Sequence, residues 1–293
     1  MLRFTKMHGI GNDYVYINTF DQTVENPSEL SRIMSCRHFG IGSDGLILIG
    51  PSDIADASMR IFNADGSEAE MCGNGLRCVA KYVFDHQIAE SRGPFTIPGN
   101  QEHFDASLII ETGNGVLSVG LAVDTNQTAQ SICVNMGRPS TRPNDIPVLV
   151  QGEIVLNYPM KIERQLLHMT CVSMGNPHAV FFIENINEFD LEHYGPLIER
   201  HALFPKRTNA HFVQIVNKNE IIIRTWERGS GVTLACGTGA CACIVAAVLN
   251  NLTERHCIAH LPGGQLTLYW NPDSEHVYMT GPAVEVFSGM WLL

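Results

Sequence analysis

Short apolar runs separated by Gly, Pro and Asn recur along most of the chain, which predicts a protein rich in β-strands. Seven segments alternate between apolar and polar positions or form compact apolar runs, and we expect strands at 14–18, 45–50, 107–111, 115–123, 178–183, 211–216 and 220–226. Many strands with few helices favour an α+β fold over a regular βαβ alternation.

Two segments instead show the spacing of a helix that faces a core. The first contains Leu76, Val79, Ala80, Val83 and Phe84, and the second contains Ala240, Cys243, Ile244, Ala247 and Val248. Parts of 28–38 and 190–203 are also expected to form amphipathic helices.

The two core-facing helices begin with the same motif. Cys72-Gly73-Asn74-Gly75 opens the first and Cys236-Gly237-Thr238-Gly239 opens the second, and the two cysteines are 236 − 72 = 164 residues apart. The same offset relates Asn12 to Asn176 and Asn63 to Glu227. One such match would be ordinary in a Gly-rich chain, but three at a single offset indicate two halves built on one plan.

We place the division near residue 130, within the polar stretch at 124–130. The expected halves are 1–130, carrying Cys72, and 131–281, carrying Cys236. The C-terminal strand, 282–293, is expected to return to the first half.

The composition narrows the classes of partner. The chain has 293 residues and a formal net charge of −11, without a clustered Lys/Arg face, so we expect no nucleic-acid partner. The N-terminus lacks a signal-peptide core and the longest apolar run, 240–249, is too short to cross a bilayer. We therefore expect a cytoplasmic protein without a membrane partner, whose nine cysteines are mostly small buried side chains.

A cysteine followed by Gly-x-Gly at a helix start has a specific chemistry. The first-turn N–H groups lack internal acceptors and the helix dipole makes this end partly positive, so a thiolate there is stabilised. The glycines let a carboxylate approach the same N–H groups. Two such starts acting on opposite faces of one carbon suit the inversion of an amino-acid α-carbon without a cofactor.

Other interpretations of these cysteines remain open at this point. A single Cys at a helix start is more often structural than catalytic. Zinc binding through Cys236, Cys241, Cys243 and one further ligand is an alternative, although the cysteine spacing matches no common site. Redox pairing of Cys72 with Cys78, or of Cys236 with Cys241, is another.

Two further polar groups stand near strand ends. His178 follows the turn Met174-Gly175-Asn176-Pro177, and Glu227-Arg228 follows the strand at 220–226. In isolation, His178 would be a structural hydrogen-bonding residue and Glu227-Arg228 a surface ion pair. The closeness in sequence of Glu227-Arg228 to Cys236 makes this pair candidate site residues, and His178 is a candidate because it could act locally at its turn.

Long motifs resemble those of the diaminopimelate epimerase family. They include KMHGIGNDY (6–14), RIFNADGSEAEMCGNGLRC (60–78), SMGNPHAV (173–180) and WERGSGVTLACGTGAC (226–241), and the resemblance spans essentially the whole chain. It implies an α+β fold of two similar, pseudo-symmetric domains. Each is expected to be a mixed or antiparallel sheet curled around a central helix, with the active site at the domain interface.

The resemblance also implies roles for individual residues. Cys72 and Cys236 would be the acid/base pair, with His178 and Glu227 assisting at the reacting centre. Substrate would be bound by Asn12, Asn63, Gly73, Asn74, Asn176, Asn209, Glu227, Arg228, Gly237 and Thr238. Arg228 would recognise the far carboxylate, since an Arg fork pairs with a carboxylate bidentately.

The family's reaction interconverts LL- and meso-diaminopimelate for lysine and peptidoglycan synthesis, with no cofactor and no metal, commonly in a homodimer. Gly45 and Val232 depart from the family pattern, where Gln and Glu are frequent, so contacts at those positions are in doubt. The rivals are a racemase of the same fold with another amino-acid substrate, and a thiol-redox or zinc-binding regulatory protein.

Overall fold

A computed structural model describes residues 1–292, which form two compact units. One unit contains Met1–Asn135 and the chain from Thr280 onward, and the other contains Met136–Met279. The sequence predicts a division near residue 130 and a returning segment at 282–293.

The N-terminal unit is a mixed sheet in which eight strands pair in the order β20–β1–β2–β3–β4–β8–β9–β10. The β2–β3 and β4–β8 pairs are parallel and the others are antiparallel. The strands are β1 (Leu2–Gly9), β2 (Asn12–Asn18), β3 (Gly45–Gly50), β4 (Ala57–Asn63), β8 (Ala106–Thr112), β9 (Gly115–Val123), β10 (Ala129–Asn135) and β20 (Val284–Trp291). Short β5 (Glu68–Ala69) pairs with β4, and β6 (Phe95–Thr96) pairs with β7 (His103–Phe104).

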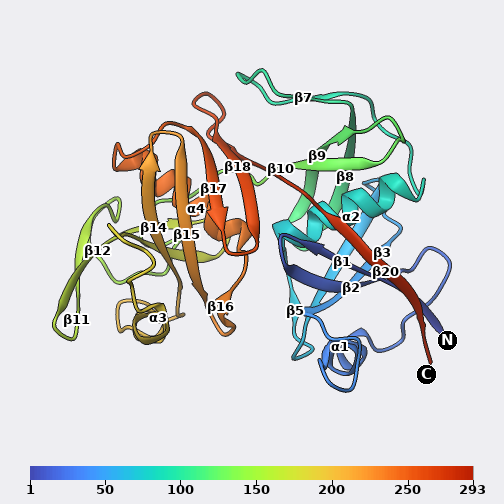
Figure 1. Ribbon diagram of the computed structural model, residues 1–293, viewed down its shortest axis with the longest axis horizontal. Coiled ribbons are helices and arrows are strands. Elements are labelled where there is room, and N and C mark those ends of the chain that lie inside the picture. The colour runs from blue at the N-terminus through green and yellow to red at the C-terminus, as the bar shows by residue number, and fades with distance from the viewer. Residues whose placement is uncertain (293) are drawn as a thin grey trace. The chain divides into compact units, whose positions relative to one another are not determined.

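Helix α2 (Gly73–Asp85) lies inside the curl of this sheet (Figure 1). It contacts strands from both ends of the strand order, among them β1, β2, β9 and β10. Leu76, Val79 and Val83 are fully buried there, as the helical spacing predicted. Helix α1 (Pro27–Ser35) packs against β3 and β4, where Leu30 and Met34 join a separate core cluster.

The C-terminal unit repeats this arrangement. Its strands pair in the order β11–β12–β13–β14–β15–β17–β18, with β13–β14 and β15–β17 parallel. They are β11 (Tyr158–Ile162), β12 (Gln165–Ser173), β13 (Pro177–Phe182), β14 (Asn209–Asn217), β15 (Glu220–Glu227), β17 (His256–Leu261) and β18 (Gly264–Trp270), and β16 (Gly231–Thr233) pairs with the end of β15. Strand β19 (Val277–Gly281) leads out of this unit into the last residues of the chain.

Helix α4 (Gly237–Leu249) is the central helix of the C-terminal unit, and α3 (Leu191–Glu199) packs against β14 and β15. All residues of α4 from Gly239 to Ala247 are buried, so this helix is apolar on every side rather than amphipathic. The expected i, i+3, i+4 stripe is therefore only part of its buried surface.

The 164-residue offset applies to whole elements. Added to the bounds of α1 it gives those of α3 (27 + 164 = 191, 35 + 164 = 199), and added to those of α2 it gives those of α4 (73 + 164 = 237, 85 + 164 = 249). The α+β class and the two-domain fold, each with a central helix, are thus confirmed. Within residues 1–292, no helix is long and apolar enough to span a membrane.

Candidate active site

Cys72 is the N-cap residue of α2. Its backbone is extended (φ −141°, ψ 113°), and its sulfur accepts a hydrogen bond from the N–H of Gly75 at 3.3 Å. Gly73 and Asn74 form the first turn and are buried. The N–H groups of this turn lie at the positive end of the helix, beside the sulfur.

Asn12 joins this helix start to strand β2. Its Oδ1 lies 3.3 Å from Cys72 Sγ and accepts a hydrogen bond from Asn74 Nδ2, also at 3.3 Å. Three of the predicted site residues of the N-terminal unit are therefore in direct contact.

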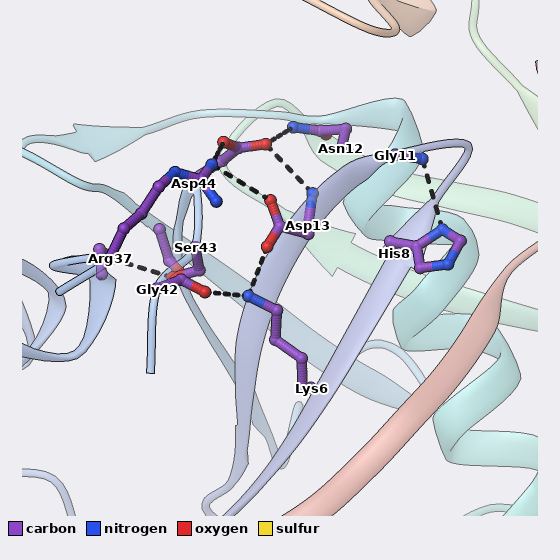
Figure 2. A network of polar contacts seen from close by, with 11 residues as sticks. Lys6, His8, Gly11, Asn12, Asp13, Arg37, Gly42, Ser43 and Asp44 are labelled. Atoms are coloured by element: carbon purple, nitrogen blue, oxygen red, sulfur yellow. Dashed lines mark hydrogen bonds and ion pairs between the residues drawn. The ribbon is translucent and has the colours of Figure 1, made fainter. Parts of the chain in front are cut away.

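A charged network holds the other side of Asn12 (Figure 2). Asn12 Nδ2 donates to Asp44 Oδ2 at 2.9 Å, and the backbone N–H of Asp13 donates to the same oxygen at 3.1 Å. Arg37 pairs with Asp44 at 3.1 Å, while Lys6 pairs with Asp13. Burial and the neighbouring Asp13 carboxylate raise the pKa of Asp44. Reasoning from the sequence missed Asp44, which fixes the Asn12 side chain.

Asn63 lies farther along the same sheet, at the end of β4, where it pairs with Gly45. Its side chain donates to Ser67 Oγ at 2.9 Å, within the turn that leads to β5. The structure thus shows Asn63 in a turn contact and not in hydrogen bonds to Cys72 or Asn12. An added Cβ at Gly45 would lie 2.1 Å from the Phe62 carbonyl oxygen, so close strand packing excludes a larger residue at that position.

Cys236 occupies the matching N-cap position of α4, with φ −122° and ψ 107°. Unlike Cys72, its side chain accepts no capping hydrogen bond from the first turn. Its sulfur lies 3.7 Å from Thr238 Oγ1, which accepts a hydrogen bond from Asn176 Nδ2 at 3.3 Å. Cys236, Thr238 and Asn176 are the counterparts of Cys72, Asn74 and Asn12 at the 164-residue offset.

His178 extends this cluster into the core. Its Nε2 lies 2.8 Å from Asn176 Oδ1 and its Nδ1 lies 2.8 Å from His211 Nε2. His211 Nδ1 lies 2.9 Å from Thr225 Oγ1. Both rings are fully buried. Burial lowers the pKa of His211 to about 3, and burial with His211 and Arg228 lowers that of His178 well below its usual value.

Strand register explains why the sequence analysis missed His211 and Thr225. His178 is opposite Asn209 in the parallel β13–β14 pair, and His211 is opposite Thr225 in the antiparallel β14–β15 pair. His211 and Thr225 each stand two residues from a predicted site residue, Asn209 and Glu227. Because strand side chains alternate with a period of two, this spacing was a usable signal.

Asn209 and Glu227 support the end of β15. Asn209 Oδ1 accepts from the backbone N–H of Arg228 at 2.9 Å, and its Nδ2 donates to the Pro177 carbonyl at 2.9 Å. Glu227 Oε1 accepts from Thr233 Oγ1 at 2.6 Å. The exposed Arg228 donates from Nη1 to the Lys206 carbonyl at 3.1 Å.

Glu199, another residue that the sequence analysis missed, braces this loop from α3. Glu199 is only 2% exposed, and its carboxylate accepts from Trp226 Nε1 at 2.7 Å and from the Gly229 N–H at 3.1 Å. Val232, the second departure from the family pattern, is 47% exposed on β16.

Several other cysteines are fully buried and have thiols that resist ionisation. Burial raises the pKa of Cys78 to about 11 and that of Cys133 to about 12, and raises that of Cys243 well above its usual value. In the described part of the chain, no group of three or more His, Cys, Asp or Glu side chains is arranged to hold a metal ion.

Solved structures with this fold include racemases and epimerases. The chain is similar to a probable proline racemase from Agrobacterium radiobacter (14% identity, TM-score 0.71, covering 100% of this chain and 93% of that one). It is also similar to a phenazine biosynthesis protein from Bacillus anthracis (16% identity, TM-score 0.68, covering 100% and 99%). The fold is therefore the one that amino-acid racemases and epimerases use.

The sequence matches define the family within that class. The model of the diaminopimelate epimerase family matches residues 4–141 and 170–286. The chain is 51% identical to a diaminopimelate epimerase from Agathobacter rectalis (98% of each protein covered). It is 47% identical to one from Methanococcus maripaludis (98% of this chain and 99% of that one). The chain belongs to the diaminopimelate epimerase family.

Proposed function

We propose that this chain interconverts LL- and meso-diaminopimelate by a two-base proton transfer, in lysine and peptidoglycan synthesis. The observation that carries the proposal is the pair of cysteines, Cys72 and Cys236, each at the N-cap of a buried thirteen-residue helix. Each cysteine is surrounded by polar side chains at equivalent positions. Family membership supplies the substrate.

The reaction needs two groups that exchange one proton with one carbon. A thiolate removes the α-proton, so that an S–H bond forms as the C–H bond breaks and the electron pair stays on the carbon. The other cysteine, as a thiol, delivers its proton to the opposite face. The mechanism therefore requires both sulfurs to reach the same α-carbon, with exchanged roles in the reverse direction.

The helix starts stabilise the charge that develops on the substrate. In the proposal, the first-turn N–H groups of Gly73-Asn74 and Gly237-Thr238 bind the α-carboxylate, which becomes more negative as the α-proton leaves. In this proposal the N–H groups stabilise the developing charge and the two cysteines transfer the proton, so the reaction uses no metal or cofactor.

Substrate choice is assigned to the end of β15. Asn209 accepts a hydrogen bond from the backbone N–H of Arg228, and Glu199 accepts one from the N–H of Gly229 in the same loop. These contacts fix the backbone position from which the exposed Arg228 side chain extends. An Arg fork at that point suits the distal carboxylate of a substrate with two amino-acid ends. Asn63, His178 and Glu227 complete the proposed set of substrate-contacting and assisting side chains.

The test uses purified protein, LL-diaminopimelate and deuterium oxide, with no added cofactor. We expect NMR to show deuterium incorporation at one α-carbon and formation of the meso isomer. A panel of single-ended amino acids, including proline and histidine, should show no exchange. Absence of α-deuteration in diaminopimelate would refute the proposal, and exchange confined to another amino acid would make the protein a racemase of that compound.

Substitution separates the two catalytic cysteines from the other seven. Cys72→Ala and Cys236→Ala should each lower kcat by about 10³-fold or more, since general acid–base groups contribute about 10²–10⁴-fold each. Cys36→Ala is the matched control, because Cys36 is the C-cap residue of α1 and stands at neither of the two helix starts. A wild-type rate in either active-site variant would exclude the two-thiol mechanism.

The proposal extends to cellular context. Two thiols that must exchange protons need a reducing compartment, which supports a cytoplasmic location. We also propose a homodimer without nucleic-acid or membrane partners. Light scattering during size-exclusion chromatography would test the dimer by measuring the molar mass in solution.

A further inference from the structure

The two helix starts have similar dipoles, although only Cys72 also accepts a capping N–H, from Gly75. Both α2 and α4 have thirteen residues, and both cysteines are N-cap residues with an extended backbone. The helix dipole alone therefore does not decide which sulfur carries the proton at rest. The neighbouring side chains differ, and their hydrogen-bond directions decide it.

At Cys72 the neighbour is an acceptor with a fixed orientation. Asp44 receives hydrogen bonds from Asn12 Nδ2, the Asp13 N–H and Arg37, three donors that favour its ionised form and oppose the rise in pKa caused by burial and Asp13. An ionised carboxylate only accepts, so the amide nitrogen of Asn12 must face Asp44 (Figure 2). The amide oxygen, Oδ1, then faces Cys72.

An amide oxygen 3.3 Å from a sulfur favours the protonated sulfur. Oδ1 of Asn12 has no hydrogen to donate, so Cys72 must be the donor in this contact. A thiolate would instead face the negative end of the carbonyl dipole. The N–H of Gly75 that points to the same sulfur is compatible with both states, because a thiol sulfur also accepts weakly.

At Cys236 a chain of hydrogen bonds leads to Thr238, whose hydroxyl is able to donate to the sulfur. Asn176 Oδ1 only accepts, so His178 carries its hydrogen on Nε2. A neutral imidazole has a single N–H, so Nδ1 of His178 must accept from Nε2–H of His211. Nδ1 of His211 then accepts from the hydroxyl of Thr225.

The other end of the Asn176 amide fixes Thr238. Asn176 Nδ2 donates to Thr238 Oγ1, so the Thr238 hydroxyl hydrogen is directed away from Asn176. Cys236 Sγ lies 3.7 Å from that oxygen. Either atom of this contact can be the donor. Because the Thr238 oxygen already accepts from Asn176, its hydroxyl hydrogen is free to point to the sulfur, and a hydroxyl that donates there favours the thiolate.

We infer that the resting chain carries the proton on Cys72 and the negative charge on Cys236, with Asp44, His211 and Thr225 as positioning residues that fix this asymmetry. The inference rests on the proposed two-thiol function for its catalytic meaning. It rests on the hydrogen-bond directions alone for the protonation states.

The titratable neighbours agree with this assignment. Tyr16 and Cys78 interact with Cys72, and burial is the main cause that raises the pKa of each, so both stay neutral. On the other side, His178 and His211 stay neutral because burial lowers the pKa of both, which keeps a single N–H on each ring.

The asymmetry has a kinetic consequence. Cys236 at rest is ready to take a proton from one of the two epimers, and Cys72 is ready to supply one to the opposite face. One turnover leaves the Cys72 sulfur ionised and the Cys236 sulfur protonated. The second epimer requires that exchanged form, so the two directions should differ in their pH profiles.

The experiment measures each thiol separately in the substrate-free protein. The rate of iodoacetamide alkylation is followed by peptide mass spectrometry from pH 5 to 10, for Cys236 in Cys72→Ala protein and for Cys72 in Cys236→Ala protein, which removes coupling between them. We expect the alkylation midpoint of Cys236 to lie below that of Cys72. Equal midpoints, or the reverse order, would overturn the inference.

Variants test the cause of the difference. Thr238→Val should raise the Cys236 midpoint by about one to two pH units, the size expected for a hydrogen bond to a charged group, while Thr238→Ser should restore it. Thr225→Val, far along the chain of hydrogen bonds, should raise it by less. Asn12→Leu should lower the Cys72 midpoint, and His193→Gln, an exposed histidine on α3, should change neither.

A spectroscopic measurement tests the directions themselves. Long-range ¹H–¹⁵N spectra of protein with labelled histidine should show His178 and His211 as Nε2–H tautomers, with His211→Gln used to assign the signals. An Nδ1–H tautomer at His178 would mean that the chain runs in the opposite sense, with Cys236 donating to Thr238, and would refute the inference. Since neither measurement uses substrate, failure of the exchange assay would refute the proposed function without changing these outcomes.

Discussion

At the scale of single residues, the exposed Arg228 of the C-terminal unit is positioned by two buried side chains that accept hydrogen bonds from its loop. Arg228 is anchored at its backbone by Asn209, and the following Gly229 N–H is anchored by Glu199. Glu199 also accepts from Trp226, so its burial is compensated by hydrogen bonds. The position of the guanidinium is thus set by residues that need not touch substrate.

Replacing Arg228 should therefore weaken binding of diaminopimelate more than it slows proton transfer. Arg228→Lys keeps the charge but loses the fork, and Arg228→Gln loses both, so we expect kcat/KM to fall about 10-fold and about 100-fold respectively. Steady-state kinetics with LL-diaminopimelate measure this. Arg164→Lys, in the exposed β11–β12 hairpin, is the control, and an unchanged KM in Arg228→Gln would exclude Arg228 from substrate binding.

At the scale of elements, the two cysteine-bearing helices differ in what lies over their first turns. A Cβ at Gly239 would lie 2.1 Å from Cε1 of the His211 ring, whereas a Cβ at Gly75 would lie 2.7 Å from the end of the Ile47 side chain. The ring is held by hydrogen bonds on both nitrogens, but the Ile47 methyl group is at the tip of a flexible side chain.

Gly239→Ala should therefore destabilise the protein by about 1–3 kcal/mol through overpacking. Gly75→Ala should be close to neutral, because relief of the helix penalty of glycine, about 1 kcal/mol, offsets a small shift of Ile47. Urea unfolding followed by circular dichroism compares the two variants. Equal losses of stability would show that His211 is not rigidly held.

The buried histidine pair on β13 and β14 should make the protein sensitive to acid. Burial lowers the pKa of His211 to about 3 from a usual value near 6.5, so the unfolded chain binds the proton more readily. This stability is present above about pH 6.5 and is lost as the pH falls toward 3. From His211 alone we expect a loss of about 2 kcal/mol between pH 7 and pH 5.

Urea unfolding at the two pH values measures this loss, and His211→Gln should show a smaller difference between them. A wild-type stability that does not change between pH 7 and pH 5 would contradict the prediction.

Much of the fold and of the site followed from local sequence patterns. The seven expected strands correspond to β2, β3, β8, β9, β13, β14 and β15, and the four expected helices correspond to α1–α4. Strand β1 was missed because Thr5 and Lys6 are buried within it, which hides the alternation, and Lys6 is neutralised by Asp13. Asp44 and His211 were missed because their contacts depend on pairing between strands distant in sequence.

At the scale of the whole molecule, the two units share one plan but are completed differently. In the C-terminal unit β12 pairs with β11, which directly precedes it in the chain. In the N-terminal unit the corresponding strand, β1, pairs with β20 from the other end of the sequence (Figure 1). The contact between Thr5 and Ser288 spans 283 residues.

Truncation after Ala283 should therefore unfold the N-terminal unit selectively. It removes the strand partner of β1 and the Trp291 side chain that packs on the core cluster of Leu2 and Phe4. Limited proteolysis should then cut within residues 1–135 while 136–279 resists. Met290→Ser, which changes a 68% exposed side chain and keeps the backbone pairing, should behave as wild type, and uniform protection of the truncated chain would refute the prediction.

Strand β20 also determines when the protein can finish folding during synthesis. The ribosome makes β1 first and β20 last, and at about 5–20 residues per second the delay is roughly a quarter of a minute to a minute. Throughout that time the β1 edge is unpaired, and an open edge is a site for pairing with other chains. The C-terminal unit, made of consecutive strands, can fold within that interval, so β1, although made before it, is among the last strands to be protected.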